Sequence, residues 1–147
     1  MKILVINGPN LNLLGIREPG IYGKSGYDAL VEKITAAGTE MGLEVECFQS
    51  NHEGAIIDKI HETLTGFDGI VINPGAYTHY IYAILDALKA VETPAVEVHI
   101  SNVHQREEFR HKSVTAAGCC GQICGLGQYG YIAALGYLKE RLSENAD

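Results

Sequence analysis

The sequence has few positive charges: Lys and Arg together number 11, against 18 Asp and Glu, which gives a net charge of -7. A phosphate backbone attracts basic surfaces, so this balance argues against nucleic-acid binding. An anionic small molecule would need its own local cluster of positive charge. Three of the four arginines, Arg17, Arg106 and Arg110, lie in two short segments rich in other polar residues, where such a cluster is expected.

Long apolar runs and cysteine motifs are also missing. The apolar run at residues 3–6 is too short for a signal peptide or a membrane span, so no membrane association is expected. The four cysteines, Cys47, Cys119, Cys120 and Cys124, form no CxxC pair. We expect them to be small core residues rather than disulfide partners or ligands of zinc or another metal. These features predict a soluble cytoplasmic protein.

The composition is typical of a folded domain. Of the 147 residues, 46% are hydrophobic and only 20% are charged, which excludes disorder and predicts one domain over residues 1–147. Short apolar runs predict five strands, at residues 3–6, 43–48, 69–73, 96–100 and 122–125. Apolar residues at helical spacing predict helices over residues 27–42, 55–64, 80–91 and 129–142.

The regular alternation of strands and helices predicts a parallel sheet covered on both faces. Five strands in this length fit an α/β domain of the doubly wound, flavodoxin-like type better than a barrel of eight strands. In such sheets, ligands bind beyond the carboxyl ends of the strands. Four informative segments fall there: residues 10–26, 73–79, 99–110 and the chain from 125 onward.

Two glycine patterns near the first strand resemble nucleotide-binding motifs but do not match them. Gly20–Ser25 ends like a phosphate loop, yet the first glycine of that motif would fall at Glu18, and residues 8–15 lack the middle glycine of GxGxxG. We therefore predict no nucleotide site. Connections after strands usually have about 2 to 6 residues, so the long segment 10–26 is expected to be functional and to act as a lid.

The strand at residues 96–100 places polar side chains on one face. Its apolar residues alternate with Glu97 and His99, and Ser101 follows in the same phase. An unpaired carboxylate inside a sheet costs several kcal/mol, so Glu97 is expected to bond to His99, two residues on. That bond would make His99 an oriented imidazole. The alternative is an edge strand with a solvated polar face.

The segment after the first strand holds an arginine close to a tyrosine, Arg17 and Tyr22. A tyrosine with an ordinary pKa of about 10 is almost fully protonated at neutral pH and is a poor base. A nearby guanidinium favours the tyrosinate, so Arg17 would lower the pKa of Tyr22 and activate it. The alternative is a solvated arginine and a packed tyrosine.

Two more loops carry candidate binding groups. Asn73 and His79 offer an amide and an imidazole for ligand hydroxyls, although a histidine in such a loop is often structural. Arg106 and Arg110 lie one helical turn apart and would both face a carboxylate, or else form a solvated charged turn.

Four motifs together resemble the type II 3-dehydroquinate dehydratases: NGPNLNLLG at 7–15, REPGIYG at 17–23, INPGAYTH at 72–79, and EVHISN with REEFR within 97–110. The resemblance covers almost the whole chain, in the same order. It implies a flavodoxin-like subunit that assembles as trimers arranged into a homododecamer. It also implies conversion of 3-dehydroquinate to 3-dehydroshikimate and water, in aromatic biosynthesis or quinate breakdown, without a metal or organic cofactor.

The resemblance implies a role for each catalytic residue. Tyr22 would remove a proton from the carbon next to the substrate ketone, giving an enolate, and Arg17 would lower the pKa of Tyr22 and stabilise the developing charge. His99 would protonate the departing hydroxyl, with Glu97 and Asn10 orienting its ring. Acid and base would then act on opposite sides of an anti elimination.

The resemblance also implies a set of substrate-binding residues, with Asp86 reaching the site of a neighbouring subunit. They are Asn73, His79, Asp86, Ile100, Ser101, Arg106 and Arg110. The sequence departs from the family pattern only late, at Cys119, Cys120 and Gln122. We expect these three residues to concern packing near the last strand rather than chemistry.

Two other functions remain open at this point. A Schiff-base dehydratase needs a lysine desolvated in the site, and the lysines fall in predicted loops and helices or at the start of the first strand. A flavodoxin-like binding or receiver module is expected to have acidic residues after the first strand and an Asp at the end of the third strand. This chain has Asn10 and Asn73 there.

Overall fold

The chain folds around a parallel sheet of five strands. The computed structural model describes residues 1–16, 20 and 26–146, and its strands are β1 (Lys2–Asn7), β2 (Glu44–Gln49), β3 (Gly69–Asn73), β4 (Ala95–His99) and β5 (Gly121–Cys124). They pair in parallel in the order β2-β1-β3-β4-β5. This is the flavodoxin-like order, so the predicted doubly wound α/β fold is confirmed.

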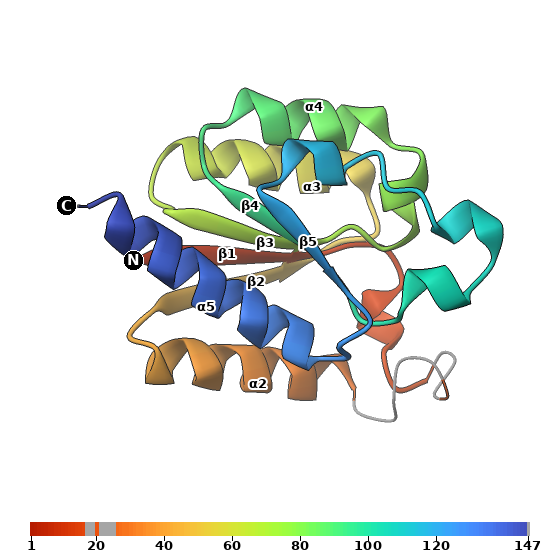
Figure 1. Cartoon of the computed structure of the whole chain (residues 1–147), viewed down its shortest axis with the longest axis horizontal. Helices are drawn as coiled ribbons and strands as arrows, with labels where there is room; N and C mark the ends of the chain where they lie inside the picture. The colour runs from red at the N-terminus through yellow and green to blue at the C-terminus, as the bar shows by residue number, and fades with distance from the viewer. Residues whose placement is uncertain (17–19, 21–25, 147) are drawn as a thin grey trace.

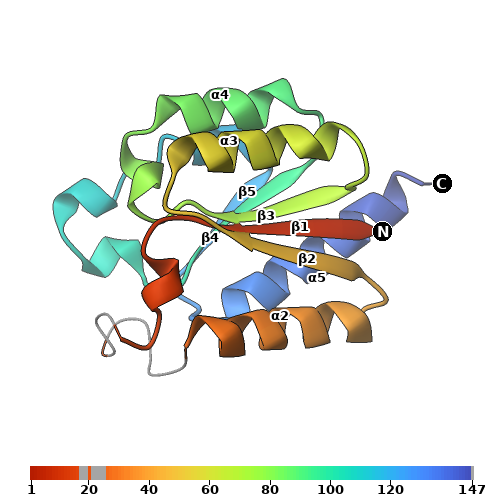
Figure 2. The same ribbon diagram turned by 180° about the vertical axis from the view of Figure 1, so that it is seen from behind.

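Within the described residues, helices cover the sheet on both faces: α2 (Tyr27–Glu40), α3 (Glu53–His61), α4 (Tyr82–Ala90) and α5 (Tyr129–Glu144). Helices α2 and α5 lie on one face, and α3 and α4 on the other (Figures 1 and 2). Strand β3 is buried along its whole length, which is why its sequence is an apolar run rather than an alternation. No helix within the described residues is both long enough and apolar enough to cross a membrane.

The loops after β1 and β3 pack backbone against backbone at the carboxyl edge of the sheet. A Cβ atom at Gly8 would lie 2.5 Å from the carbonyl oxygen of Pro74, and Gly75 has a φ of +58° and packs against Pro9. Only glycine accepts such close approach and this backbone conformation without strain. The first and third loops are thereby held side by side.

Short 3-10 turns follow several strands and were not predicted by apolar spacing. Those after β1, β3 and β4 span Leu11–Leu13, Gly75–His79, Val103–Gln105 and Glu108–Arg110. Such turns are too short to show a period, and local hydrogen bonds stabilise them, for example Asn102 Oδ1 accepting from the His104 N–H. They fix the loops from which the site is built.

The cysteines are free thiols in different surroundings. Burial raises the pKa of Cys47 to about 11 and that of Cys119 to about 12, as expected for thiols packed beside the core. Cys120 is exposed, so the prediction that all four are core residues is wrong for this one. It directly precedes β5, the last strand of the sheet, where burial is least.

Candidate active site

A pocket opens at the carboxyl ends of β1, β3 and β4. It is lined by eight of the twelve residues that the sequence predicts as site residues: Asn10, Asn73, His79, His99, Ile100, Ser101, Arg106 and Arg110. These residues come from three loops far apart in the chain. They meet because parallel strands that share a sheet end at one edge.

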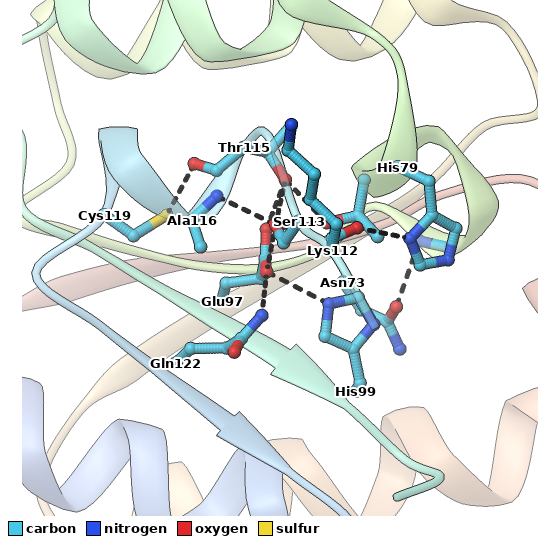
Figure 3. A network of polar contacts seen from close by, with 12 residues as sticks. Asn73, His79, Glu97, His99, Lys112, Ser113, Thr115, Ala116, Cys119 and Gln122 are labelled. Atoms are coloured by element: carbon cyan, nitrogen blue, oxygen red, sulfur yellow. Dashed lines mark hydrogen bonds and ion pairs between the residues drawn. The ribbon is translucent and has the colours of Figure 1, made fainter. Parts of the chain in front are cut away.

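Glu97 lies behind the pocket on β4, with its side chain fully buried and Oε2 3.1 Å from Nε2 of His99. The edge-strand alternative is therefore wrong, since β4 is paired on both sides and Glu97 is 0% exposed. Four more donors reach this carboxylate, and Figure 3 labels three of them, Ser113, Thr115 and Gln122. They are the hydroxyls of Thr78, Ser113 and Thr115 and the amide of Gln122.

The donors around Glu97 keep it ionised. Burial by itself would raise the pKa of this carboxyl, but hydrogen bonds from His99, Thr115 and Gln122 outweigh burial and lower the pKa to about 2. An ionised carboxylate accepts hydrogen bonds and has no proton to donate. Nε2 of His99 must therefore carry a proton.

This tautomer decides what His99 can do in the pocket. With Nε2 occupied by Glu97, Nδ1 is the nitrogen left for a ligand, and His99 lines the pocket. In the imidazolium form Nδ1 is a donor. In the neutral form Nδ1 is an acceptor. The pair can thus give a proton to a bound molecule and take one back.

His79 lines the same pocket, but its protein contact is made through Nδ1 rather than through Nε2 as in His99. Its Nδ1 lies 2.7 Å from the carbonyl oxygen of Lys112, which only accepts, so Nδ1 carries a proton and Nε2 is an acceptor. Burial lowers the pKa of His79, which favours the neutral ring. The ring packs edge-on against Phe109, with centroids 5.9 Å apart. His79 is therefore suited to accept a hydrogen bond from a ligand hydroxyl.

Asn73, the last residue of β3, is held by a buried chain of hydrogen bonds. Its Oδ1 accepts from the Gly75 N–H at 3.1 Å, and its Nδ2 donates to the Tyr131 hydroxyl at 2.9 Å. That hydroxyl donates in turn to Oδ1 of Asn7 at 2.6 Å. Because one Nδ2 proton is committed to Tyr131, the second is the one available to a ligand in the pocket.

Two arginines supply the positive charge that an anionic ligand needs. Arg106 Nη1 donates to Oγ of Ser101 at 3.3 Å, which ties a cation to a pocket hydroxyl. Arg110 Nε donates to Oε2 of Glu107 at 2.8 Å. The guanidinium of Arg110 lies over the Phe109 ring, with Cζ 4.7 Å from the ring centroid. Both line the pocket, so a local cationic region exists on a chain of negative net charge.

The other predicted site residues are placed less directly. Asn10 lines the pocket in a left-handed conformation, with φ of 68°, but within the described residues no hydrogen bond joins its side chain to His99. Asp86 is exposed on α4 and is not among the residues that line the pocket. Arg17 and Tyr22 lie outside the described residues.

Comparison with known proteins shows the family. Residues 1–139 match the family described as Dehydroquinase class II. This chain belongs to the class II dehydroquinases. The 3-dehydroquinate dehydratase of Clostridium perfringens (strain ATCC 13124) is 63% identical over 143 residues, covering 97% of this chain and 99% of that protein. The 3-dehydroquinate dehydratase of Thermotoga maritima is 60% identical over 144 residues, with coverage of 98% and 99%.

A solved structure agrees with this family membership. The crystal structure of a type II dehydroquinase from Butyrivibrio crossotus superposes with a TM-score of 0.92 at 64% sequence identity. The match covers 94% of this chain and 97% of that one. The fold of this class II dehydroquinase and the resemblance seen in its sequence therefore lead to the same family.

Lysine chemistry finds no support in the described part of this class II dehydroquinase. No described lysine lines the pocket, and Lys24 lies outside the described residues. Lys59 lies 2.8 Å from Glu46 and 2.7 Å from Glu62, and these carboxylates raise its pKa. An imine-forming lysine needs the opposite shift. Among the described residues, no three His, Cys, Asp or Glu side chains are grouped so that they could hold a metal ion.

Gln122 makes a contact in this class II dehydroquinase that its sequence did not indicate. We expected Gln122 to concern packing near the last strand, and its Nε2 also donates a hydrogen bond to Oε2 of Glu97 at 2.6 Å. The two residues are register partners on β4 and β5, so their side chains lie on the same face of the sheet. Ser113 and Thr115 reach Glu97 from a loop, which no strand period could indicate.

Proposed function

We propose that this chain catalyses the dehydration of 3-dehydroquinate to 3-dehydroshikimate and water. Family membership and the names of the relatives support this reaction. The observation that carries the proposal is the Glu97–His99 pair, in which a buried ionised carboxylate holds an imidazole with one nitrogen left for the pocket. Elimination of water from a β-hydroxyketone needs such a proton donor at the departing oxygen.

In this proposal His99 acts as the general acid. The imidazolium donates its Nδ1 proton to the hydroxyl group as the carbon–oxygen bond breaks, and the enolate electron pair becomes the new carbon–carbon double bond. The hydroxyl leaves as water. Glu97 holds Nε2 and fixes the direction in which Nδ1 donates, and Asn10, which lines the same pocket, would help to orient the ring.

Tyr22 acts as the base that forms the enolate. It would take the proton next to the ketone, and Arg17 would lower the pKa of Tyr22 and stabilise the negative charge that develops on the substrate. The support is the REPGIYG motif at residues 17–23 and the family membership of the chain. Base and acid on opposite faces of the ring give an anti elimination.

The pocket residues would hold the substrate by its carboxylate and its hydroxyls. Ser101, which accepts from Arg106, and the backbone of Ile100, which lines the same pocket, would bind the carboxylate. Asn73, with an amide proton to donate, and His79, with Nε2 to accept, would bind ring hydroxyls. Arg110, which also lines the pocket, would bind the ring hydroxyls together with Asn73 and His79.

The remaining expectations concern assembly and location. Asp86, exposed on α4, would reach the site of a neighbouring subunit in a dodecamer built from trimers. Tyr82, the first residue of this helix, and Tyr80, just before it, are 62% and 58% exposed and support a subunit contact on this side. Action without a cofactor and a cytoplasmic location stay predictions.

The test is an ultraviolet assay for the conjugated enone formed from 3-dehydroquinate. His99→Ala and Tyr22→Phe should each lower kcat at least about a hundredfold with an unchanged fold. His61→Ala and Tyr137→Phe, which alter exposed residues away from the pocket, should keep the rate. A purified wild-type protein that leaves 3-dehydroquinate unchanged would overturn the proposal. Near-normal rates in His99→Ala or Tyr22→Phe would overturn that residue's role.

A further inference from the structure

Gln122 connects the surface of an edge strand to the buried carboxylate behind the pocket. It lies on β5, the last strand of the sheet, and is itself exposed, whereas Glu97 is 0% exposed. Its Nε2 donates to Oε2 of Glu97 at 2.6 Å (Figure 3). A hydrogen bond to an ionised acceptor at this distance is among the stronger polar contacts in proteins.

Gln122 and His99 share one carboxylate oxygen. Oε2 of Glu97 also accepts from Ser113 Oγ at 2.8 Å, so three donors converge on it, with Gln122 nearest and His99 farthest at 3.1 Å. A carboxylate oxygen has about two lone-pair directions, so these donors compete. The hydrogen bonds from Gln122 and Ser113 therefore weaken the hydrogen bond that this oxygen accepts from the His99 N–H.

We propose that Gln122 is a positioning residue for the acid: its amide fixes the Glu97 carboxylate and limits the negative charge felt by His99, so that the imidazolium releases its Nδ1 proton readily. This rests on the proposed function for the direction of proton transfer. The contact itself stands on geometry alone. Gln122 acts only through Glu97 and touches no reacting atom.

Other ionisable groups around this pair bear on any pH dependence. His79 faces the pair from the 3-10 turn after β3, and the two arginines line the pocket from the loop after β4. Two thiols lie near Glu97, and burial raises the pKa of each above its ordinary value. These groups are His79, Arg106, Arg110, Cys119 and Cys124, and a substitution of Gln122 leaves all of them in place.

The carboxylate does not depend on Gln122 for burial of its charge. Without Gln122, Oε1 would keep the hydroxyls of Thr78 and Thr115, and Oε2 would keep Ser113 and His99. Gln122→Leu keeps the bulk of the side chain on an exposed strand position. We therefore expect this variant to fold, with a carboxylate that binds the His99 N–H more strongly.

The experiment compares Gln122→Leu with Gln128→Leu, a half-buried glutamine that makes no side-chain hydrogen bond within the described chain. The first readout is kcat for 3-dehydroquinate as a function of pH. The second is the midpoint of an NMR titration of the His99 ring, which does not depend on turnover. The His99 signal is assigned by its absence from the spectrum of His99→Asn. Gln122→Leu should move both midpoints upward by about half a pH unit or more, which corresponds to roughly a threefold change in proton affinity. KM should stay within about twofold.

Gln122→Glu sharpens the comparison because it adds a second negative charge at the same position. Its midpoints should move further upward than those of Gln122→Leu, whereas Gln128→Leu should match the wild type. Unchanged or lowered midpoints in both Gln122 variants would overturn the proposal. Loss of activity with unmoved midpoints would assign Gln122 a merely structural role. An inactive wild type would overturn the proposed function alone, because the NMR midpoints still decide the role of Gln122.

Discussion

Replacing Glu97 by glutamine should remove much of the acid sensitivity of folding while the fold is kept. Glutamine has the shape of the buried carboxylate, and its oxygen can occupy the Oε2 position that faces His99. Its NH2 group would then face the hydroxyls of Thr78 and Thr115, which can rotate to accept. No buried group needs to be left without a partner.

The magnitude follows from the shift of the Glu97 carboxyl. Burial raises its pKa and the surrounding donors lower it, with a net fall from 4.5 to about 2. Since a shift of one unit corresponds to about 1.4 kcal/mol, ionised Glu97 contributes about 3 kcal/mol to the free energy of unfolding. The folded-state pKa is the lower one, so this stabilisation is complete above the unfolded value of 4.5 and disappears as the pH falls through about 2.

The assay is urea unfolding followed by circular dichroism, at one protein concentration, for the wild type and Glu97→Gln. Between about pH 6 and pH 3 the wild type should lose about 2 kcal/mol more than the variant. Other carboxyls with lowered pKa values, such as Glu46 and Glu107, are present in both proteins and cancel in the difference. Equal losses in the two proteins would refute an ionised Glu97 as the anchor of the site.

Three further predictions test other parts of the account. Tyr131→Phe removes the buried hydroxyl between Asn73 and Asn7, so urea unfolding should show a loss of about 1–3 kcal/mol, and steady-state kinetics should show a raised KM; unchanged stability would mean that water replaces the hydroxyl. Arg17→Ala should lower kcat more than it raises KM, because the charge it stabilises grows toward the transition state; a change in KM alone would make Arg17 a substrate-binding residue. Borohydride added with 3-dehydroquinate should leave activity intact, and inactivation with a mass increase on a lysine would revive the Schiff-base alternative.

The fold could be predicted from the sequence because a strand that is buried on both faces has an unbroken run of apolar residues. Residues 3–6 and 70–72 are unbroken apolar runs, and they lie in β1 and β3, two interior strands of the sheet whose side chains pack into the cores on both faces. The helix predicted over 80–91 is observed at Tyr82–Ala90, since the N–H groups of Tyr80 and Ile81 donate back to the carbonyl oxygen of Tyr77 in the preceding 3-10 turn. Local hydrogen bonds set such ends, and apolar spacing does not record them.

Most residues that line the pocket were predicted, but the hydrogen bonds between site residues could be predicted only where the partners are close in the chain. Glu97 and His99 are two residues apart on one strand, so their pairing could be read from a period of two. Tyr131 could not be found this way, because its hydroxyl meets Asn7 and Asn73 only after α5 packs on the sheet. Gln122 required the register of β5 against β4, which no local pattern contains.

In the proposed mechanism, Glu97 holds His99 so that its free nitrogen serves as the acid opposite the tyrosine of the REPGIYG motif. The most direct measurement is a crystal structure of the protein with a ring-shaped enolate mimic of 3-dehydroquinate bound. We expect Nδ1 of His99 within hydrogen-bond distance of the atom that stands for the departing oxygen, with the Tyr22 hydroxyl on the opposite face of the ring. A mimic bound in the pocket with Nδ1 turned away from that atom, or with both groups on one face, would contradict it.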